Sequence, residues 1–210
     1  MATTSSTPGG PDRSRRTRFG LVTVLVVLAG SSIFAALRTS TTFDEIVLVA
    51  AGARALETGS WTLVVDQPPV MPFLYGMAVR ASGPEYPSEI RERMWTYDDR
   101  WEYARDFFFR VGNDPERLTL RSRLVAVAMA LVLVWAAWLY GGWISGPTTG
   151  LIAAFLVAFT PDVVAHGAVA YNDVALALAY LLALWAADAA VRKPTAVRGA
   201  VAGVAVALAM

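Results

Sequence analysis

Long apolar runs separated by polar stretches are the feature that most limits how this chain can fold. The longest runs cover residues 21–37, 124–143 and 174–191. Helices of these lengths reach most or all of the way across a hydrocarbon core of roughly 30 Å, because an α-helix rises about 1.5 Å per residue. Hydrophobic residues make up 56% of the chain and charged residues 17%, which is too apolar for an ordinary soluble domain. The sequence therefore predicts an all-α, polytopic transmembrane helical protein.

The charges around the first run predict its orientation. Four arginines lie in the stretch RSRRTR directly before it. Arginine and lysine near the ends of spans favour the cytoplasmic side, so we expect residues 1–18 to form a disordered cytoplasmic tail and residues 38–120 to form a large outer loop. A cleaved signal peptide is the alternative for the first run.

Three further crossings follow from the same pattern. The second span begins at Arg123, and the fourth covers residues 173–191 and is followed by basic residues on the expected cytoplasmic side. The third is short, roughly residues 150–160, and either borrows residues from Trp143 onward or is tilted.

A fifth apolar run, residues 199–210, is too short to cross a bilayer. We therefore expect the transmembrane domain over residues 19–210 to be the truncated N-terminal part of a longer protein.

The outer loop is itself expected to contain helices. Apolar residues recur at helical spacing after Asp44, and Gly59 suits the end of that helix near the membrane surface. Pro68, Pro69 and Pro72 favour an extended turn, with a second apolar helix after Pro72.

The end of the outer loop combines charge with aromatic rings. Residues 88–111 alternate charged and aromatic side chains. This pattern is typical of an amphipathic juxtamembrane helix with its rings at headgroup depth, and a solvated helix packed on its neighbours is the alternative.

The residue inventory argues against several kinds of site. Cysteine is absent and His166 is the only histidine, so disulfides and His/Cys metal clusters are excluded. Asp98 and Asp99 are adjacent and point to different helix faces, so we expect no metal and no other cofactor. The net charge of +1 gives no basic surface for nucleic acid.

Four segments carry a family resemblance. In chain order they are the pair Asp44-Glu45 followed by AAGARALETGSW, then DQPPVMPFLYG, GNDPERLTLRSRLVAV and AFTPDVVAHGAVAYNDVALAL. Together they resemble the N-terminal part of the GT-C class of polyprenyl-phosphate-dependent glycosyltransferases, in particular the protein O-mannosyltransferases and the lipid A aminoarabinose transferases. Gln67 departs from this pattern, because the family has a histidine before the proline pair.

The resemblance implies a GT-C-like fold and an activity. Such a protein transfers a hexosyl or pentosyl group from a polyprenyl-phosphate sugar to a protein, lipid or polysaccharide acceptor on the non-cytoplasmic face. We therefore expect a multi-pass protein of the plasma (inner) membrane whose partners are membrane lipids, the lipid-linked donor and the acceptor. The implied catalytic residues are Asp44, as general base or acceptor-orienting carboxylate, Glu45, which supports it, and Asp173. The implied substrate-binding residues are Arg123, which contacts the donor phosphate, with His166, Arg121, Pro68 and Pro69.

The predicted topology agrees with these roles. Asp44, Arg123, His166 and Asp173 all fall at the outer ends of spans, where a base and a phosphate-binding cation can meet. Arginines on the outer flank of a span also run against the positive-inside bias, which favours an anionic ligand there. The alternatives are that Asp44 and Asp173 are helix caps and that the arginines snorkel or pair with nearby acids.

Two other functions remain open from the sequence. One is half of a secondary transporter, in which intramembrane charges mark a substrate path. The other is an inactive remnant produced by truncation. The large outer loop and the position of the charges at span ends favour the glycosyltransferase.

Overall fold

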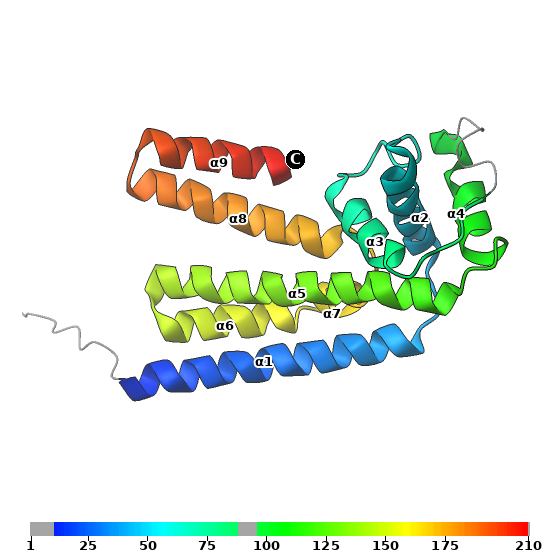
Figure 1. Ribbon diagram of the computed structural model, residues 1–210. Helices are drawn as coiled ribbons and strands as arrows, with labels where there is room; N and C mark the ends of the chain where they lie inside the picture. Colours follow the sequence, from blue (N-terminus) through cyan, green and yellow to red (C-terminus); the bar gives the residue numbers. More distant parts are fainter. Residues whose placement is uncertain (1–10, 88–95, 210) are drawn as a thin grey trace, which may run out of the picture.

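The computed structural model describes residues 11–87 and 96–209, and this part of the chain is entirely helical (Figure 1). The predicted all-α class is therefore confirmed. The elements are α1 (Pro11–Arg38), α2 (Phe43–Thr58), α3 (Val70–Arg80), the 3-10 helix η1 (Tyr97–Asp99), α4 (Arg100–Phe109), α5 (Pro115–Ser145), α6 (Pro147–Ala158), α7 (Pro161–His166), α8 (Asp173–Arg192) and α9 (Ala196–Ala209).

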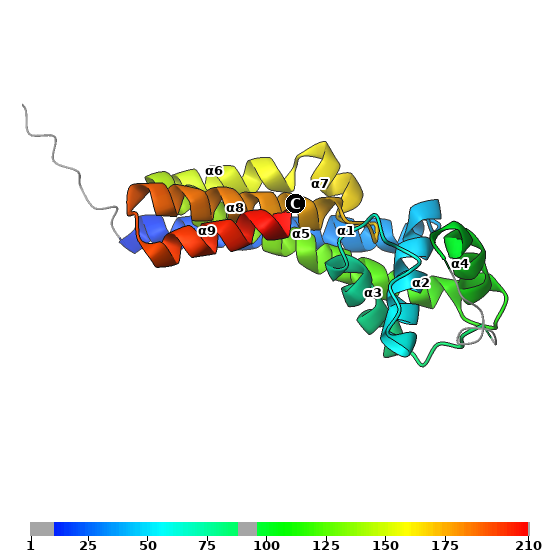
Figure 2. The same ribbon diagram turned by 90° about the horizontal axis from the view of Figure 1, so that it is seen from above.

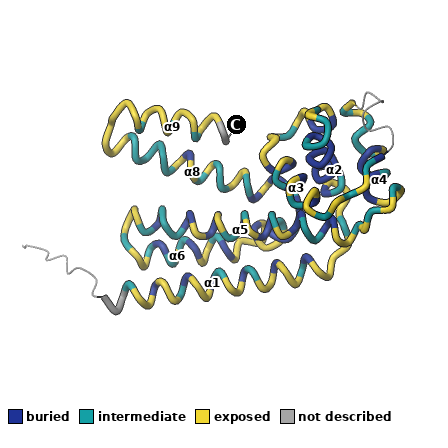
Figure 3. The backbone as a smooth tube through the Cα atoms, in the orientation of Figure 1, coloured by how far each residue is buried: buried dark blue, intermediate teal, exposed yellow. Residues whose placement is uncertain are grey.

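The long helices form a bundle. Within the described residues, three helical segments are long and apolar enough to cross a membrane, namely Ser14–Arg38, Pro115–Ser145 and Asp173–Arg192. They run along one common direction, together with the shorter α6 and α9 (Figures 1 and 2). The helices predicted for the first, second and fourth spans are therefore confirmed. Their surfaces expose many apolar side chains, as lipid-facing helices require (Figure 3).

The third predicted span differs from the expectation. α5 continues through Ser145 and ends at Gly146, at φ 90°, so α6 gains only residues 147–149 ahead of Gly150 and not the stretch from Trp143 to Ser145. The 12 residues of α6 reach only about 18 Å. α7 continues the same layer along the bundle beyond the end of α6 (Figures 1 and 2).

The second half of the expected disordered tail is helical. Residues 1–10 lie outside the described part, but residues 11–18 form the first turns of α1. Pro11 fits there because the first helical position needs no N–H, and arginine is a good helix former.

The helices α2, α3, η1 and α4 pack into a lobe at one end of the bundle (Figure 1). Helix α2 ends as predicted, because Gly59 is left-handed, at φ 76°, and donates its N–H to the Ala55 carbonyl. Helix α3 begins at Val70, before rather than after Pro72, because proline is tolerated in the first turn of a helix.

Three aromatic side chains of α4 pack inside the protein rather than facing outward, as the headgroup prediction requires. Tyr103, Phe107 and Phe108 are fully buried in the core of the lobe, whose helices are the darkest part of Figure 3. Each buried aromatic ring contributes roughly 2–3 kcal/mol of hydrophobic stabilisation. The alternative, a helix packed on its neighbours, therefore holds for α4, while residues 88–95 of that prediction lie outside the described part.

Two glycines allow α2 and α3 to cross in direct backbone contact. A Cβ added at Gly52 would collide with the Pro72 carbonyl oxygen, and one added at Gly76 would collide with the Gly52 backbone. No side chain can be accommodated at either position unless the two helices separate.

The Gly52→Ala variant tests this crossing. We expect it to destabilise the protein by about 3 kcal/mol or more, because the added methyl group meets backbone that cannot move aside. The measurements are thermal unfolding in detergent and the amount of protein in the membrane. Gly30→Ala is the control, since nothing lies within 4 Å of its added Cβ. Equal stability of the two variants would contradict the close packing.

Candidate active site

A buried ion pair joins α2 to α5. Arg123 Nε and Nη2 each donate to one carboxylate oxygen of Glu45 at 2.8 Å. The exposed fractions of these side chains are 0% and 1%. The remaining guanidinium hydrogens go to the end of α1, through the carbonyl oxygen of Ala36 at 3.0 Å, and to the segment after it, through the carbonyl oxygens of Thr39 and Ser40 at 2.8 Å. All five N–H donors of Arg123 are therefore used inside the protein.

This geometry corrects the role expected for Arg123. The side chain has no solvent-exposed surface and no spare donor, so it cannot hold the phosphate of a lipid donor in this structure. Glu45 is equally enclosed and cannot touch a substrate. The pair instead fixes the positions of the elements around it.

Glu45 holds two further segments. Its carboxylate accepts the Thr42 N–H at 2.7 Å, at the start of α2, and the Ala170 N–H at 2.8 Å, in the loop before α8. Burial alone raises the pKa of Glu45, but the hydrogen bonds from Arg123, Ala170 and Thr42, with the Arg123 charge, outweigh it and place the pKa below its ordinary value. Glu45 is therefore a buried carboxylate ion at neutral pH.

Asp44 has the opposite environment. It is exposed at the start of α2 and borders a pocket of about 140 Å³, which we call the Asp44 pocket. The walls come from α2, the loop between α2 and α3, the η1–α4 segment and the loop before α8. The lining residues are Asp44, Val47, Leu48, Val64, Asp66, Gln67, Tyr97, Arg100, Trp101 and Tyr171.

The Tyr171 side chain lies close enough to three carboxylates to be affected by their charges. Partial burial raises the pKa of Tyr171, and the charges of Asp44, Asp173 and Asp66 raise it further. Tyr171 therefore stays protonated and can donate its O–H. Asp66 accepts the hydroxyl of Tyr97 at 2.8 Å, which holds that carboxylate at the pocket wall.

Arg100 supplies positive charge to the same pocket. It is the one cation among the described lining residues. Its guanidinium carbon lies 3.6 Å from the centre of the Tyr97 ring, and Nη1 donates to the Tyr97 carbonyl at 2.6 Å. Stacking on the ring and this hydrogen bond fix the guanidinium while leaving other N–H groups for a ligand.

Asp173 and His166 lie beside the pocket rather than in its wall. The two side chains are about half exposed, and His166 Nδ1 is 3.4 Å from Asp173 Oδ2. Asp173 is close enough to Tyr171 to affect its pKa. The loop between His166, at the end of α7, and Asp173, at the start of α8, is held by the Ala170 hydrogen bond to Glu45, so the structure brings Asp44 and Asp173 to one region.

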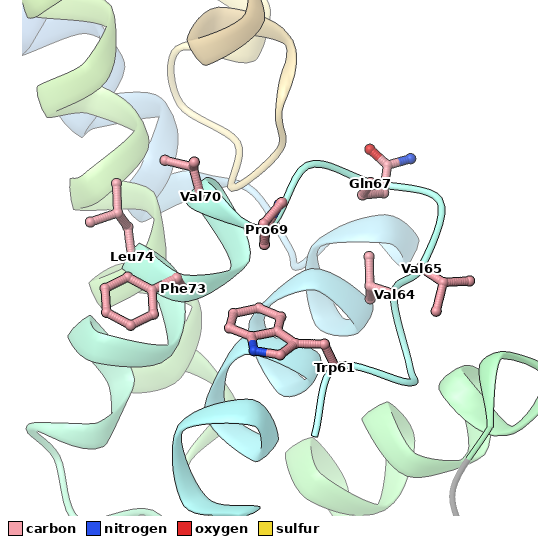
Figure 4. A pocket seen from close by; sticks show the side chains of 8 residues that line it. All are labelled: Trp61, Val64, Val65, Gln67, Pro69, Val70, Phe73 and Leu74. Atoms are coloured by element: carbon pink, nitrogen blue, oxygen red, sulfur yellow. The ribbon is translucent and has the colours of Figure 1, made fainter. Parts of the chain in front are cut away.

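An apolar groove adjoins the Asp44 pocket, with which it shares Val64 and Gln67. Its volume is about 650 Å³ (Figure 4). The lining residues are Trp61, Val64, Val65, Gln67, Pro69, Val70, Phe73 and Leu74. Gln67 accepts the Asn172 side-chain amide at 2.7 Å, which ties the groove to the loop before α8.

The other predicted binding residues have different surroundings. Pro69 lines the groove and precedes α3, whereas Pro68 lines neither cavity and shapes the turn. Arg121 donates to the Ala78 carbonyl at 3.4 Å and borders neither cavity.

Sequence reasoning missed several residues of the pocket. Asp66 and Tyr171 lie inside segments that carry the family resemblance, next to Gln67 and two residues before Asp173, so their proximity along the chain was a usable signal. Tyr97 and Arg100 come from the segment interpreted as interfacial, and nothing in the sequence shows that it packs beside α2. Among the described residues, no group of three or more metal-ligating side chains is present, and independence from metal remains a prediction.

Comparison with known proteins identifies a family for this chain. Residues 103–210 match a family model described as dolichyl-phosphate-mannose-protein mannosyltransferase. No curated protein and no solved structure matches the chain. The matched range contains α5 to α9, and with them Arg123, His166 and Asp173, while Asp44 precedes it.

The Glu45→Gln variant tests the anchoring role of the ion pair. We expect a loss of about 3–5 kcal/mol in the free energy of unfolding, because the variant leaves a buried guanidinium without its counter-charge. Denaturant unfolding in detergent measures the loss. Asp106→Asn is the control, since it removes an exposed pair with Arg110 at 3.0 Å and costs at most about 1 kcal/mol.

The pH dependence gives an independent check. Because the folded-state pKa of Glu45 is lowered, its contribution is fully present above the pKa of the unfolded chain and is lost as the pH falls through the folded-state pKa. The wild-type protein should lose this stability on acidification, and Glu45→Gln should lack that part of the pH dependence. Identical pH profiles would contradict the assignment.

Proposed function

This chain belongs to the dolichyl-phosphate-mannose-protein mannosyltransferase family, and from that premise we propose that it transfers a sugar from a polyprenyl-phosphate donor to an acceptor hydroxyl. The observation that carries the proposal is the junction of the Asp44 pocket with the apolar groove, which share Val64 and Gln67. A polyprenyl-phosphate sugar has a long apolar tail and an anionic, polar head. The junction offers adjacent surfaces for both parts.

The groove suits the first units of the prenyl chain. Its walls are mainly aliphatic and aromatic side chains from α3 and from the loop before it, including Trp61 and Phe73 (Figure 4). Apolar walls with few polar groups are typical of sites for apolar ligands. The head of a donor lying in the groove then reaches the Asp44 pocket at Gln67.

Asp44 is the proposed general base. Its carboxylate is exposed to the pocket and takes the proton of the acceptor hydroxyl while that oxygen attacks the anomeric carbon of the sugar. The bond from this carbon to the phosphate oxygen breaks, and the polyprenyl phosphate leaves with the electron pair. A single displacement of this kind inverts the anomeric configuration.

Arg100 is the proposed phosphate-binding residue, in place of Arg123. Its stacked guanidinium lies in the wall of the same pocket. Guanidinium groups bind phosphate oxygens through forked hydrogen bonds and stabilise the charge that develops on the leaving group. The Tyr171 hydroxyl is a neutral donor nearby, and Asp173 with His166 can orient the acceptor.

The location of the reaction follows from the charge distribution. The arginines at the start of α1 favour a cytoplasmic N-terminus. The lobe lies at the other end of the bundle (Figure 1), so we place the transfer on the non-cytoplasmic face of the plasma (inner) membrane. The family description names dolichyl-phosphate mannose and protein, so a mannosyl group and a protein hydroxyl are the first pair to test. Other hexosyl or pentosyl groups, and lipid or polysaccharide acceptors, are the next.

The Asp44→Asn variant tests the base. We expect transfer to fall at least about 100-fold, with no change in the amount of protein in the membrane, because the amide cannot accept the proton. The assay follows radiolabelled mannose from a polyprenyl-phosphate donor into acceptor in isolated membranes. Asp162→Asn, an exposed acid outside the pocket, is the control. Wild-type turnover in Asp44→Asn would reject the assignment, and substrate counterflow without any transfer would favour a transporter.

The Arg100→Gln variant tests phosphate binding. We expect the KM for the lipid donor to rise about tenfold and the KM for the acceptor to change little, because a charge-assisted hydrogen bond to phosphate is lost. Steady-state kinetics with each substrate varied in turn separate the two values. Arg105→Gln is the matched control, since this exposed arginine is on the same helix but does not line the pocket. An unchanged donor KM would count against the role of Arg100.

A further inference from the structure

Gln67 lies where the apolar groove meets the Asp44 pocket. It lines both cavities, as Val64 does, and it brings a polar side chain to their junction. Figure 4 shows Gln67 at the edge of the groove, apart from the aromatic rings of Trp61 and Phe73. Its amide is therefore placed between the apolar cavity and the polar one.

The oxygen of this amide is held by the loop before α8. Gln67 Oε1 accepts from Asn172 Nδ2 at 2.7 Å. Asn172 is buried, and its loop is tethered two residues earlier, where the Ala170 N–H donates to Glu45 at 2.8 Å. The orientation of the Gln67 amide is therefore fixed before any ligand binds.

The nitrogen of the same amide is available to a ligand. Among the described residues, Gln67 Nε2 has no hydrogen-bond partner, and they do not enclose it. A side-chain amide nitrogen carries two N–H donors and no acceptor. Ionised phosphate oxygens only accept hydrogen bonds, so they complement such a group, and the bond is stronger than one between neutral groups.

We propose that Gln67 Nε2 donates to a phosphate oxygen of the polyprenyl-phosphate donor, an inference that rests on the proposed function and deepens it. In such a donor the phosphate joins the prenyl tail to the sugar. Gln67 likewise lies between the groove proposed for the tail and the pocket proposed for the sugar. Arg100 supplies the charge for the phosphate, and the amide fixes where along the groove the phosphate stops. Because Oε1 is already held, little side-chain freedom is lost on binding.

The experiment measures the binding of farnesyl phosphate and of farnesol to the purified full chain in a neutral detergent, by isothermal titration calorimetry. Farnesyl phosphate has a prenyl tail and a phosphate but no sugar, and farnesol has the tail alone. We expect the wild-type protein to bind farnesyl phosphate at least about tenfold more tightly than farnesol, because only the phosphate can form charge-assisted hydrogen bonds. Equal affinity for the two would overturn the proposal.

Two variants of Gln67 remove the N–H donors in different ways. Gln67→Glu keeps the shape of the side chain and an oxygen for Asn172, and Gln67→Met adds no charge. Each should raise the Kd for farnesyl phosphate about tenfold and leave the Kd for farnesol unchanged. A weaker affinity in Gln67→Glu alone would reduce the effect to charge repulsion and overturn the proposal. An equal loss for farnesol would assign the effect to the groove and also overturn it.

Asn172→Ala is the matched control, because it breaks the same side-chain hydrogen bond but keeps the Gln67 donors. We expect it to raise the Kd for farnesyl phosphate only about threefold, and to add nothing when combined with Gln67→Met, since it acts through Gln67. Equal losses in Asn172→Ala and Gln67→Met would assign the effect to the loop and reject the phosphate contact.

The transfer assay separates this inference from the proposed function. Transfer by the wild-type protein, with an unchanged Kd for farnesyl phosphate in both Gln67 variants, would reject the role of Gln67 alone. No transfer, together with the expected changes in Kd, would reject the transferase and keep the contact between Gln67 and a lipid phosphate.

Discussion

The bidentate pair between Glu45 and Arg123 is the interaction on which the rest of the site depends. Through it the end of α1, the start of α2, the outer part of α5 and the loop before α8 are held together. Removing two charges from water is costly, and a buried pair is tolerated only where every remaining donor and acceptor is satisfied. Here all five donors of Arg123 are used, so the pair holds its neighbours in one arrangement.

The pair also explains why two acids are adjacent in the sequence. Successive residues of a helix point about 100° apart, so one member of the Asp44-Glu45 pair can face the protein while the other faces the pocket. Glu45 is locked as an ion by its partners, whereas Asp44 is exposed and borders the pocket. An anchored carboxylate therefore positions the proposed base, and the loop bearing Tyr171, with Asp173 directly after it, is held near Asp44 by the same anchor.

How far the sequence predicted this structure depends on whether the signal is local. The helices α2, α5 and α8 were predictable because apolar length, periodicity and the Gly59 terminus are properties of neighbouring residues. The burial of Arg123 was not, since the sequence shows a charge near a span but not its partner 78 positions away. The aromatic residues of α4 fit a headgroup layer and a protein core equally well, and only the packing of α4 against α2 decides between them.

The position of the candidate site follows from the different surroundings of the lobe and the bundle. The lobe suits water, and the bundle suits lipid. The lobe buries aromatic and aliphatic side chains in a core of the kind found in soluble domains, whereas the bundle exposes its apolar surface (Figure 3). Helix α5 belongs to both, and Arg123 stands where its polar first turns give way to its apolar remainder. The proposed donor, with a prenyl tail and a phosphosugar head, needs both environments within one molecular length. The boundary between lobe and bundle, with the groove on one side of Gln67 and the Asp44 pocket on the other, is where this chain provides them.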